Sequence, residues 1–215
     1  SPWNYTVLLA MAELAGALAA GNTAVLKPSE LTPLVGQLLG ELAREAGLPP
    51  GVLHVVTGDG RTGQALTHAP VDRICFTGSV ATGKRVALAA ADRLVPTTLE
   101  LGGKDPALVL ADADPDFTAQ GLAWAGFVNA GQVCASAERV YVHAQVADAF
   151  LARLTARVQA LKVGNGLTPG TEIGPLISRA QRDRIQAQVD DAVAKGATVV
   201  LGGHAIDGPG HFFEP

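Results

Sequence analysis

Residues 71–103 read VDRICFTGSVATGKRVALAAADRLVPTTLELGG, and this stretch decides the fold class. The apolar run at 71–76 predicts a strand, residues 80–90 have the apolar period of a helix, and 96–101 predict a second strand. Strands that alternate with helices pair in parallel through right-handed crossovers. The stretch therefore predicts an α/β fold with a parallel sheet.

The same alternation continues on both sides of this stretch. The predicted helices lie near 7–18, 34–42, 64–67, 115–129, 146–158 and 185–193, and the predicted strands at 23–26, 52–56, 107–110, 140–143 and 198–201. The apolar faces of the first two helices are expected to be Val7, Met11, Leu14 and Leu18, and then Leu34, Leu38 and Leu42. Gly102 and Gly103 interrupt the alternation, so we expect two units, 1–102 and 103–215.

Composition excludes several classes of protein. The 215 residues are 48% hydrophobic and 17% charged, too apolar for intrinsic disorder, and fit one to two domains. A net charge of −4 gives no electrostatic footprint for nucleic acid. The two cysteines form no spaced pair, which argues against a disulfide framework and a metal site. Residues 1–5 lack the features of a signal peptide, so a cytoplasmic protein is expected.

Residues 117–137 carry no charge and approach the length of a membrane span. The segment contains polar side chains and three glycines, and no basic cluster flanks it. We expect a buried element of a soluble protein and no membrane partner.

Two polar clusters lie at the ends of predicted elements near the N-terminus. Asn4 precedes the first helix, where its side chain either caps that helix or donates to a developing oxyanion. Lys27-Pro28-Ser29-Glu30 follows a strand, at the sheet edge where ligands bind in parallel sheets. Lys27 and Glu30 are therefore candidates to hold ribose hydroxyls; the alternative is a solvated turn in which Ser29 caps the next helix.

Glycine-containing turns offer candidate phosphate sites. Phe76-Thr77-Gly78-Ser79 runs from a strand into a helix, whose first N–H groups attract phosphate. Gly58-Asp59-Gly60 follows the preceding strand and is a second candidate. The spacing differs from the Gly-x-Gly-x-x-Gly dinucleotide fingerprint, so each turn alone is weak support.

The two cysteines have different sequence surroundings. Cys75 lies inside an apolar strand and is expected to be a buried structural residue. Cys134 follows Gly131-Gln132, and a glutamate, Glu100, stands at the expected boundary. A thiol and a carboxylate are what covalent acyl chemistry requires, so Cys134 is either structural or a nucleophile.

Taken together, these clusters resemble the aldehyde dehydrogenase superfamily along essentially the whole chain. The motifs that carry the resemblance occur in the family's order: Pro2-Trp3-Asn4, Gly21-Asn22-Thr23, Lys27-Pro28-Ser29-Glu30, Phe76-Thr77-Gly78-Ser79, Glu100-Leu101-Gly102-Gly103-Lys104, Asn129-Ala130-Gly131-Gln132-Val133-Cys134 and Gly174-Pro175-Leu176. The resemblance implies a parallel Rossmann-like cofactor-binding sheet in 1–102 and a second α/β catalytic domain in 103–215, both incomplete.

The resemblance also implies a reaction, the oxidation of an aldehyde to a carboxylic acid through a cysteine thiohemiacetal and thioester. Cys134 would be the nucleophile, Asn4 an oxyanion donor and Glu100 the residue that activates water. The cofactor would be NAD, with NADP as the alternative. The implied cofactor-binding residues are Lys27, Ser29, Glu30, Gly58, Thr77, Gly78, Ser79, Leu101 and Gly102.

The same resemblance indicates what departs from the family. Segments normally precede Pro2 and follow Pro215, so the chain is expected to be an internal fragment of a homo-oligomeric protein and a poor enzyme alone. Thr6 replaces a usual proline, and Glu13 stands where many members carry lysine. The aldehyde is not defined, although 131–142 and 202–213 are similar to members that act on small hydroxyaldehydes and semialdehydes.

Three other functions stay open at this point. A relative that transfers the acyl group to coenzyme A commonly lacks the glutamate found here as Glu100. A cysteine hydrolase or transferase requires a histidine partner, and no histidine falls in a recognisable pairing motif. The third alternative is a folded but catalytically inactive dehydrogenase fragment.

Overall fold

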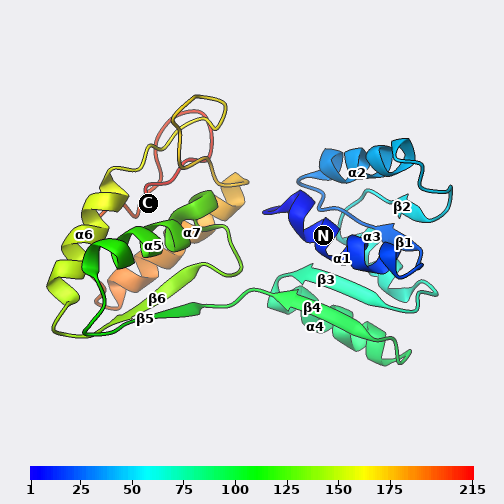
Figure 1. Ribbon diagram of the computed structural model, residues 1–215, viewed down its shortest axis with the longest axis horizontal. Coiled ribbons are helices and arrows are strands. Elements are labelled where there is room, and N and C mark those ends of the chain that lie inside the picture. Colours follow the sequence, from blue (N-terminus) through cyan, green and yellow to red (C-terminus); the bar gives the residue numbers. More distant parts are fainter. The chain divides into compact units, whose positions relative to one another are not determined.

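The computed structural model describes residues 1–215 and has the α/β architecture that the sequence predicts. The chain divides into two compact units, Ser1–Gly102 and Gly103–Pro215, each with its own strands and helices (Figure 1). The assignment of the first unit to a dinucleotide-binding domain and of the second to a catalytic domain stays a prediction.

The first unit alternates helices and strands, and its strands pair in parallel as predicted. β1 pairs with β2 and β3 with β4, as two separate two-stranded sheets. The elements are α1 (Thr6–Ala19), β1 (Ala24–Leu26), α2 (Pro33–Glu45), β2 (Leu53–Val55), α3 (Gly60–His68), β3 (Ile74–Gly78), α4 (Val80–Ala91) and β4 (Thr97–Leu101).

The core of the first unit lies where α1 covers β1. Ala10, Leu14 and Leu26 are buried there, and Leu18 packs against them. The predicted apolar face of α1 is therefore right for Leu14 and Leu18 and wrong for Val7 and Met11, which are exposed. Ala10, next to Met11 in the sequence, takes the place of Met11 in the buried face.

The predicted apolar face of α2 is wrong. Leu34, Leu38 and Leu42 are exposed, whereas Gly36 is buried. A Cβ atom at Gly36 would lie 2.5 Å from Pro28 Cγ, so the absence of a side chain lets the helix approach the chain after β1. Because α2 packs through Gly36, the leucines at 34, 38 and 42 face outward.

The second unit has one parallel strand pair, β5 with β6, and helices on it (Figure 1). Its elements are β5 (Asp105–Val109), α5 (Pro115–Phe127), the 3-10 helix η1 (Val128–Gly131), β6 (Ala137–Val142), α6 (Ala147–Gln159) and α7 (Arg179–Ala194). Val109, Ala119 and Phe150 form the buried core between the strands, α5 and α6.

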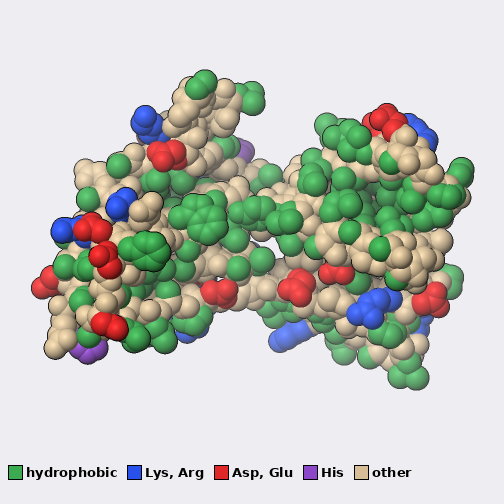
Figure 2. All heavy atoms as spheres, in the orientation of Figure 1, with side chains coloured by type: hydrophobic (Ala, Val, Ile, Leu, Met, Phe, Trp, Pro, Cys, Tyr) green, Lys and Arg blue, Asp and Glu red, His purple; other side chains and the backbone are tan.

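The uncharged segment 117–137 is buried on one side only, which corrects the expectation of a buried element. Ala119 and Ala123 are buried, but Phe117 and Trp124 are 80% and 70% exposed. No helix of the chain combines the length and apolarity that a bilayer crossing needs. Hydrophobic side chains are also visible on the surface of both units (Figure 2).

The predicted strand at 198–201 is wrong. No strand forms there, and Val199 and Val200 are about half exposed. A strand requires a backbone partner for its N–H and C=O groups. In this part of the chain the pairing is instead a single antiparallel bridge between Ala205 and Phe213.

Candidate active site

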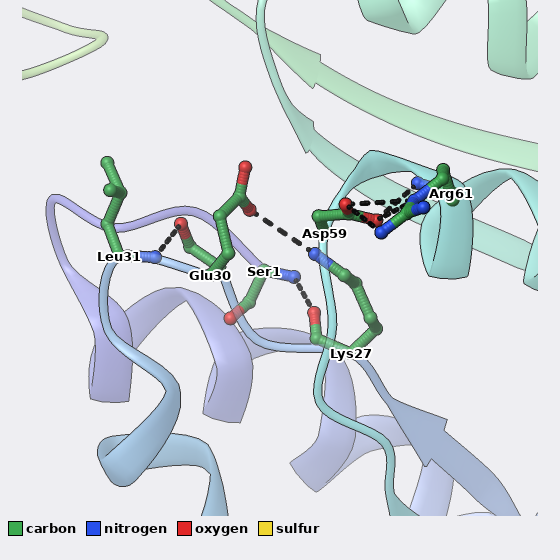
Figure 3. A network of polar contacts seen from close by, with 7 residues as sticks. Ser1, Lys27, Glu30, Leu31, Asp59 and Arg61 are labelled. Carbon is green, nitrogen blue, oxygen red and sulfur yellow. Dashed lines mark hydrogen bonds and ion pairs between the residues drawn. The ribbon is translucent and has the colours of Figure 1, made fainter.

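The chain that leaves β1 forms a compact polar turn. Lys27 Nζ lies 3.4 Å from Glu30 Oε2, and Ser29 Oγ accepts the Leu31 N–H at 3.2 Å (Figure 3). Ser29 is 8% exposed, whereas Glu30 is exposed. The alternative in which Ser29 caps α2 is wrong, because the N-cap of that helix is Thr32. The turn therefore presents an ion pair whose carboxylate faces solvent.

The second glycine turn follows β2 and is closed by its own aspartate. Asp59 Oδ1 accepts the Arg61 N–H at 2.9 Å and thereby caps α3, and its carboxylate also pairs with the Arg61 guanidinium (Figure 3). Gly58 has φ of +149°, and a Cβ atom there would collide with the Thr62 side chain. The Asp59 carboxylate already occupies the start of α3. Gly58 can therefore offer a ligand only a close approach to its backbone.

The third turn connects β3 to α4 and leaves no acidic side chain at the helix start. Ser79 is the N-cap of α4, and its Oγ accepts the Thr82 N–H at 3.3 Å. Gly83 brings the helix close to β4, since a Cβ atom there would lie 2.5 Å from Leu101 Cδ2. The start of α4 thus keeps the partial positive charge that favours a phosphate.

One cleft of the first unit, of about 1840 Å³, brings most of these turn residues together. Its lining includes the predicted cofactor residues Lys27, Ser29, Glu30, Thr77, Gly78 and Ser79. The predicted residues Gly58, Leu101 and Gly102 are not among its lining residues. The cleft combines a lysine, exposed carboxylates and a helix start, which suits a ligand with both hydroxyl and phosphate groups.

Glu100 and Asn4 also belong to the first unit. Glu100 is exposed on β4, and the parallel register places it beside Thr77 and places Leu101 beside Gly78. Asn4 is half-buried just before α1, but the N-cap of that helix is Tyr5, so the capping alternative for Asn4 is not what forms.

Cys134 lies in the second unit, on the loop between η1 and β6, and is exposed. The turn before it is unusual, because Asn129, Ala130 and Gly131 have φ of +54°, +57° and +71°. Ser136, two residues after Cys134, is 2% exposed, and its hydroxyl donates to the C=O groups of Ala125 and Gly126. The thiol thus stands on a loop that is open to solvent and anchored on α5.

Cys75 departs from the expected buried structural thiol, because it is exposed on β3. Partial burial raises the pKa of its thiol above the ordinary value, and a hydrogen bond and the charge of Glu13 raise it further. Contacts with Arg73 and Thr98 act in the opposite direction. No group of three acidic, histidine or cysteine side chains in the chain is arranged to hold a metal ion.

Comparison with known proteins decides the family. The model of the aldehyde dehydrogenase family matches residues 1–215, the whole chain. The chain belongs to the aldehyde dehydrogenase family. Mitochondrial aldehyde dehydrogenase of Leishmania tarentolae is 45% identical over 217 residues, which cover 100% of this chain and 44% of that protein.

Solved aldehyde dehydrogenases superpose closely on the chain. The crystal structure of lactaldehyde dehydrogenase from Escherichia coli gives a TM-score of 0.97 at 40% identity, covering 100% of this chain and 46% of that one. Betaine aldehyde dehydrogenase from Staphylococcus aureus, solved in complex with NAD⁺, gives 0.95 at 40% identity, covering 100% and 44%. This aldehyde dehydrogenase chain therefore spans less than half the length of the proteins that it matches.

The sequence does not indicate the anchoring role of Ser136, nor the contacts that Glu13 makes with Cys75 and Gln132 with a distant segment. Ser136 had no distinguishing signal, since a buried serine reads like any other small polar residue. Gln132 and Gly174-Pro175-Leu176 belong to two separate motifs. The hydrogen bond that joins them runs from the N–H of Ile177, which follows Leu176, to the Gln132 side chain, across 45 positions of sequence.

Proposed function

We propose that the full-length protein containing this chain oxidises an aldehyde to a carboxylic acid, with Cys134 as the nucleophile. The observation that carries the proposal is an exposed thiol on an anchored loop, within a chain that matches the aldehyde dehydrogenase family throughout. The related structures carry the names of chemically different aldehydes, so the proposal is limited to small aldehydes in general.

The first chemical step assigns the roles of Cys134 and Asn4. The Cys134 thiolate attacks the carbonyl carbon, and the carbonyl electron pair moves to oxygen to give a thiohemiacetal oxyanion. The backbone N–H of Cys134 and the side-chain amide of Asn4 are the proposed donors to that oxyanion. One such donor contributes roughly 10²- to 10³-fold to the rate.

The second chemical step assigns the role of Glu100. Loss of hydride from the thiohemiacetal carbon leaves a thioester on Cys134, which water must then cleave. The Glu100 carboxylate is the proposed base that takes a proton from this water, so that the acid is released and the thiol is restored. Its exposure on β4 is compatible with access to water.

The proposed place for a nicotinamide dinucleotide is the cleft of the first unit. Glu30 and Lys27 are proposed to bind the adenosine ribose hydroxyls, and Ser79 with the start of α4 to bind phosphate. The chemistry that the dinucleotide supplies when bound is acceptance of the hydride. Gly58, Leu101 and Gly102 stay predicted cofactor residues, as do a homo-oligomeric state and a cytoplasmic location.

The main test compares the two cysteines in the full-length protein. We expect Cys134→Ala to lower kcat for NAD reduction, followed at 340 nm with a short aliphatic aldehyde, by more than about 10³-fold. Cys75→Ala is the matched control and should retain most of the activity. Retained activity in Cys134→Ala would remove this cysteine from the mechanism. Acyl transfer to added coenzyme A would favour the acyl-transferring relative, and a wild type without turnover would favour an inactive dehydrogenase.

The cofactor prediction concerns Glu30. Its carboxylate repels the 2′-phosphate of NADP by like charge, and Lys27 at 3.4 Å weakens that repulsion. We expect Glu30→Ser to raise the ratio of kcat/KM for NADP to that for NAD by roughly tenfold. Glu45→Ser, at the far end of α2, is the control. An unchanged ratio would mean that Glu30 does not face the ribose.

A further inference from the structure

The side chain of Gln132 joins two segments that lie far apart in the sequence. Its Nε2 donates to the C=O of Asn129 at 3.0 Å, and its Oε1 accepts the N–H of Ile177 at 2.9 Å. One amide therefore uses both its donor and its acceptor, and the two partners are backbone groups of different segments. Gln132 lies two residues before Cys134.

The segment that Gln132 holds is a turn of unfavourable backbone conformation. We call residues 129–132 the nucleophile turn. Asn129 and Ala130 have φ of +54° and +57°, a region that L-residues rarely adopt, and alanine has no polar side chain to stabilise it. Asn129 Nδ2 donates back to the Gln132 C=O at 3.3 Å, so the two amide side chains brace the turn reciprocally.

The other partner of Gln132 belongs to a fixed part of the second unit. Ile177 directly follows Leu176, which is 3% exposed and whose N–H donates to the His211 C=O at 2.9 Å. Ile173, four residues earlier, is also 3% exposed and bonds to Lys162 through its N–H. The Ile177 N–H is thus a firm point to which the nucleophile turn is attached.

We infer that Gln132 is a positioning residue for Cys134. Gln132 fixes the chain before the thiol by joining the nucleophile turn to Ile177, and Ser136 fixes the chain after it on α5. Cys134 is held between these two anchors while its side chain stays exposed. This inference rests on the proposed function, in which the thiol and its own N–H must both face the aldehyde. A displacement of about 1 Å lowers such a rate by up to roughly 10²-fold.

The chain offers a matched control in Gln186 on α7. Its Oε1 accepts the Ala205 N–H at 3.1 Å, and its Nε2 donates to the Gly203 C=O at 3.4 Å and to Asp190 at 2.9 Å. Gln186 therefore bridges two segments of the same unit as Gln132 does, but neither segment carries Cys134.

The experiment compares Gln132→Met with Gln186→Met in the full-length protein, since methionine keeps the shape and removes both hydrogen bonds. Amide hydrogen exchange followed by peptide mass spectrometry reads the backbone of 129–136 and of Ile177, independently of turnover. We expect exchange there to accelerate about tenfold or more in Gln132→Met and to stay unchanged in Gln186→Met. Unchanged exchange in Gln132→Met would overturn the inference, whether or not the wild type oxidises aldehydes.

Turnover and alkylation complete the test. We expect kcat to fall roughly 10- to 100-fold in Gln132→Met, with KM for NAD unchanged. Alkylation of Cys134 by iodoacetamide, in a Cys75→Ser background, should stay within about threefold, because the thiol remains exposed. If Gln132→Met does not fold, Gln132→Glu keeps the acceptor for Ile177 and loses the donor to Asn129, so exchange at 129–136 should still be faster and kcat lower than in the wild type. If the wild type turns over and a folded Gln132 variant has the same kcat, the positioning role of Gln132 is contradicted and the proposed function is not. A wild type without turnover would contradict the proposed function.

Discussion

The strand β3 and the loop before β6 each carry one of the two cysteines, and both thiols are exposed. Cys75 lies in a regular ladder, paired in register with Thr98, and contacts Glu13, Arg73 and Thr98. Cys134 lies outside any strand, after three consecutive residues of positive φ and before the buried Ser136. The two thiols are therefore alike in exposure and differ in the backbone that carries them.

The electrostatic surroundings add to this difference. Partial burial and then Glu13 raise the pKa of Cys75, so at neutral pH its thiolate fraction lies below that of an ordinary thiol. The thiolate is the reactive form of cysteine, so the partial burial of Cys75 and its contact with Glu13 lower the reactivity of its thiol. Glu13 therefore acts on Cys75, which is not the proposed nucleophile.

The largest expected effect, apart from loss of Cys134 itself, is that of Glu100→Gln. Without the base, hydrolysis of the thioester should slow by roughly 10²- to 10⁴-fold, because the amide cannot take the proton from water. A rapid-mixing experiment should show a burst of NADH followed by a slow steady rate. Glu41→Gln, an exposed glutamate on α2, serves as the control. A normal steady rate in Glu100→Gln would contradict the role of Glu100 as the base that activates water.

A smaller effect is expected for Ser136→Ala. Loss of the hydroxyl that bonds to Ala125 and Gly126 should lower the free energy of unfolding of the second unit by about 1 kcal/mol. Ser178→Ala removes the N-cap of α7 and should cost about the same. Thermal denaturation measures both losses. Only Ser136→Ala should also lower kcat; an equal kcat in the two variants would mean that the anchor does not position Cys134.

The smallest expected effect concerns Cys75. Glu13→Gln removes a negative charge that raises the thiol pKa, so the pKa should fall and the thiolate fraction at pH 8 should rise. Alkylation of Cys75 by iodoacetamide should accelerate by no more than about tenfold. Alkylation of Cys134 in the same protein is the internal control. A slower reaction at Cys75 would contradict the sign of the Glu13 effect.

The order of the elements and the parallel pairing follow from sequence alone, because alternating apolar periods are local signals. Which helix face is buried does not follow. Leu34, Leu38 and Leu42 form a regular stripe on α2, yet Gly36 decides the packing through its contact with Pro28. Likewise 198–201 has strand composition but no backbone partner.

The candidate site was predictable as a set of motifs but not as a set of contacts. The turn residues Lys27, Ser29 and Glu30 were found because they follow a strand, and the cleft of the first unit does bring them together with Ser79. The bond from Gln132 to Ile177 joins residues 45 positions apart, a distance over which sequence periodicity carries no information. Apolar neighbours in a strand predict burial of both faces, but Cys75 is exposed on β3.

The contrast between the two cysteines is tested most directly by locating the acyl group. Full-length Glu100→Gln protein is mixed with NAD and a short aliphatic aldehyde, quenched in acid, digested and analysed by peptide mass spectrometry. We expect the mass of the acyl group on the peptide that contains Cys134 and none on the peptide that contains Cys75. An acyl group on Cys75, or NAD reduction with no acyl group on either cysteine, would contradict Cys134 as the nucleophile.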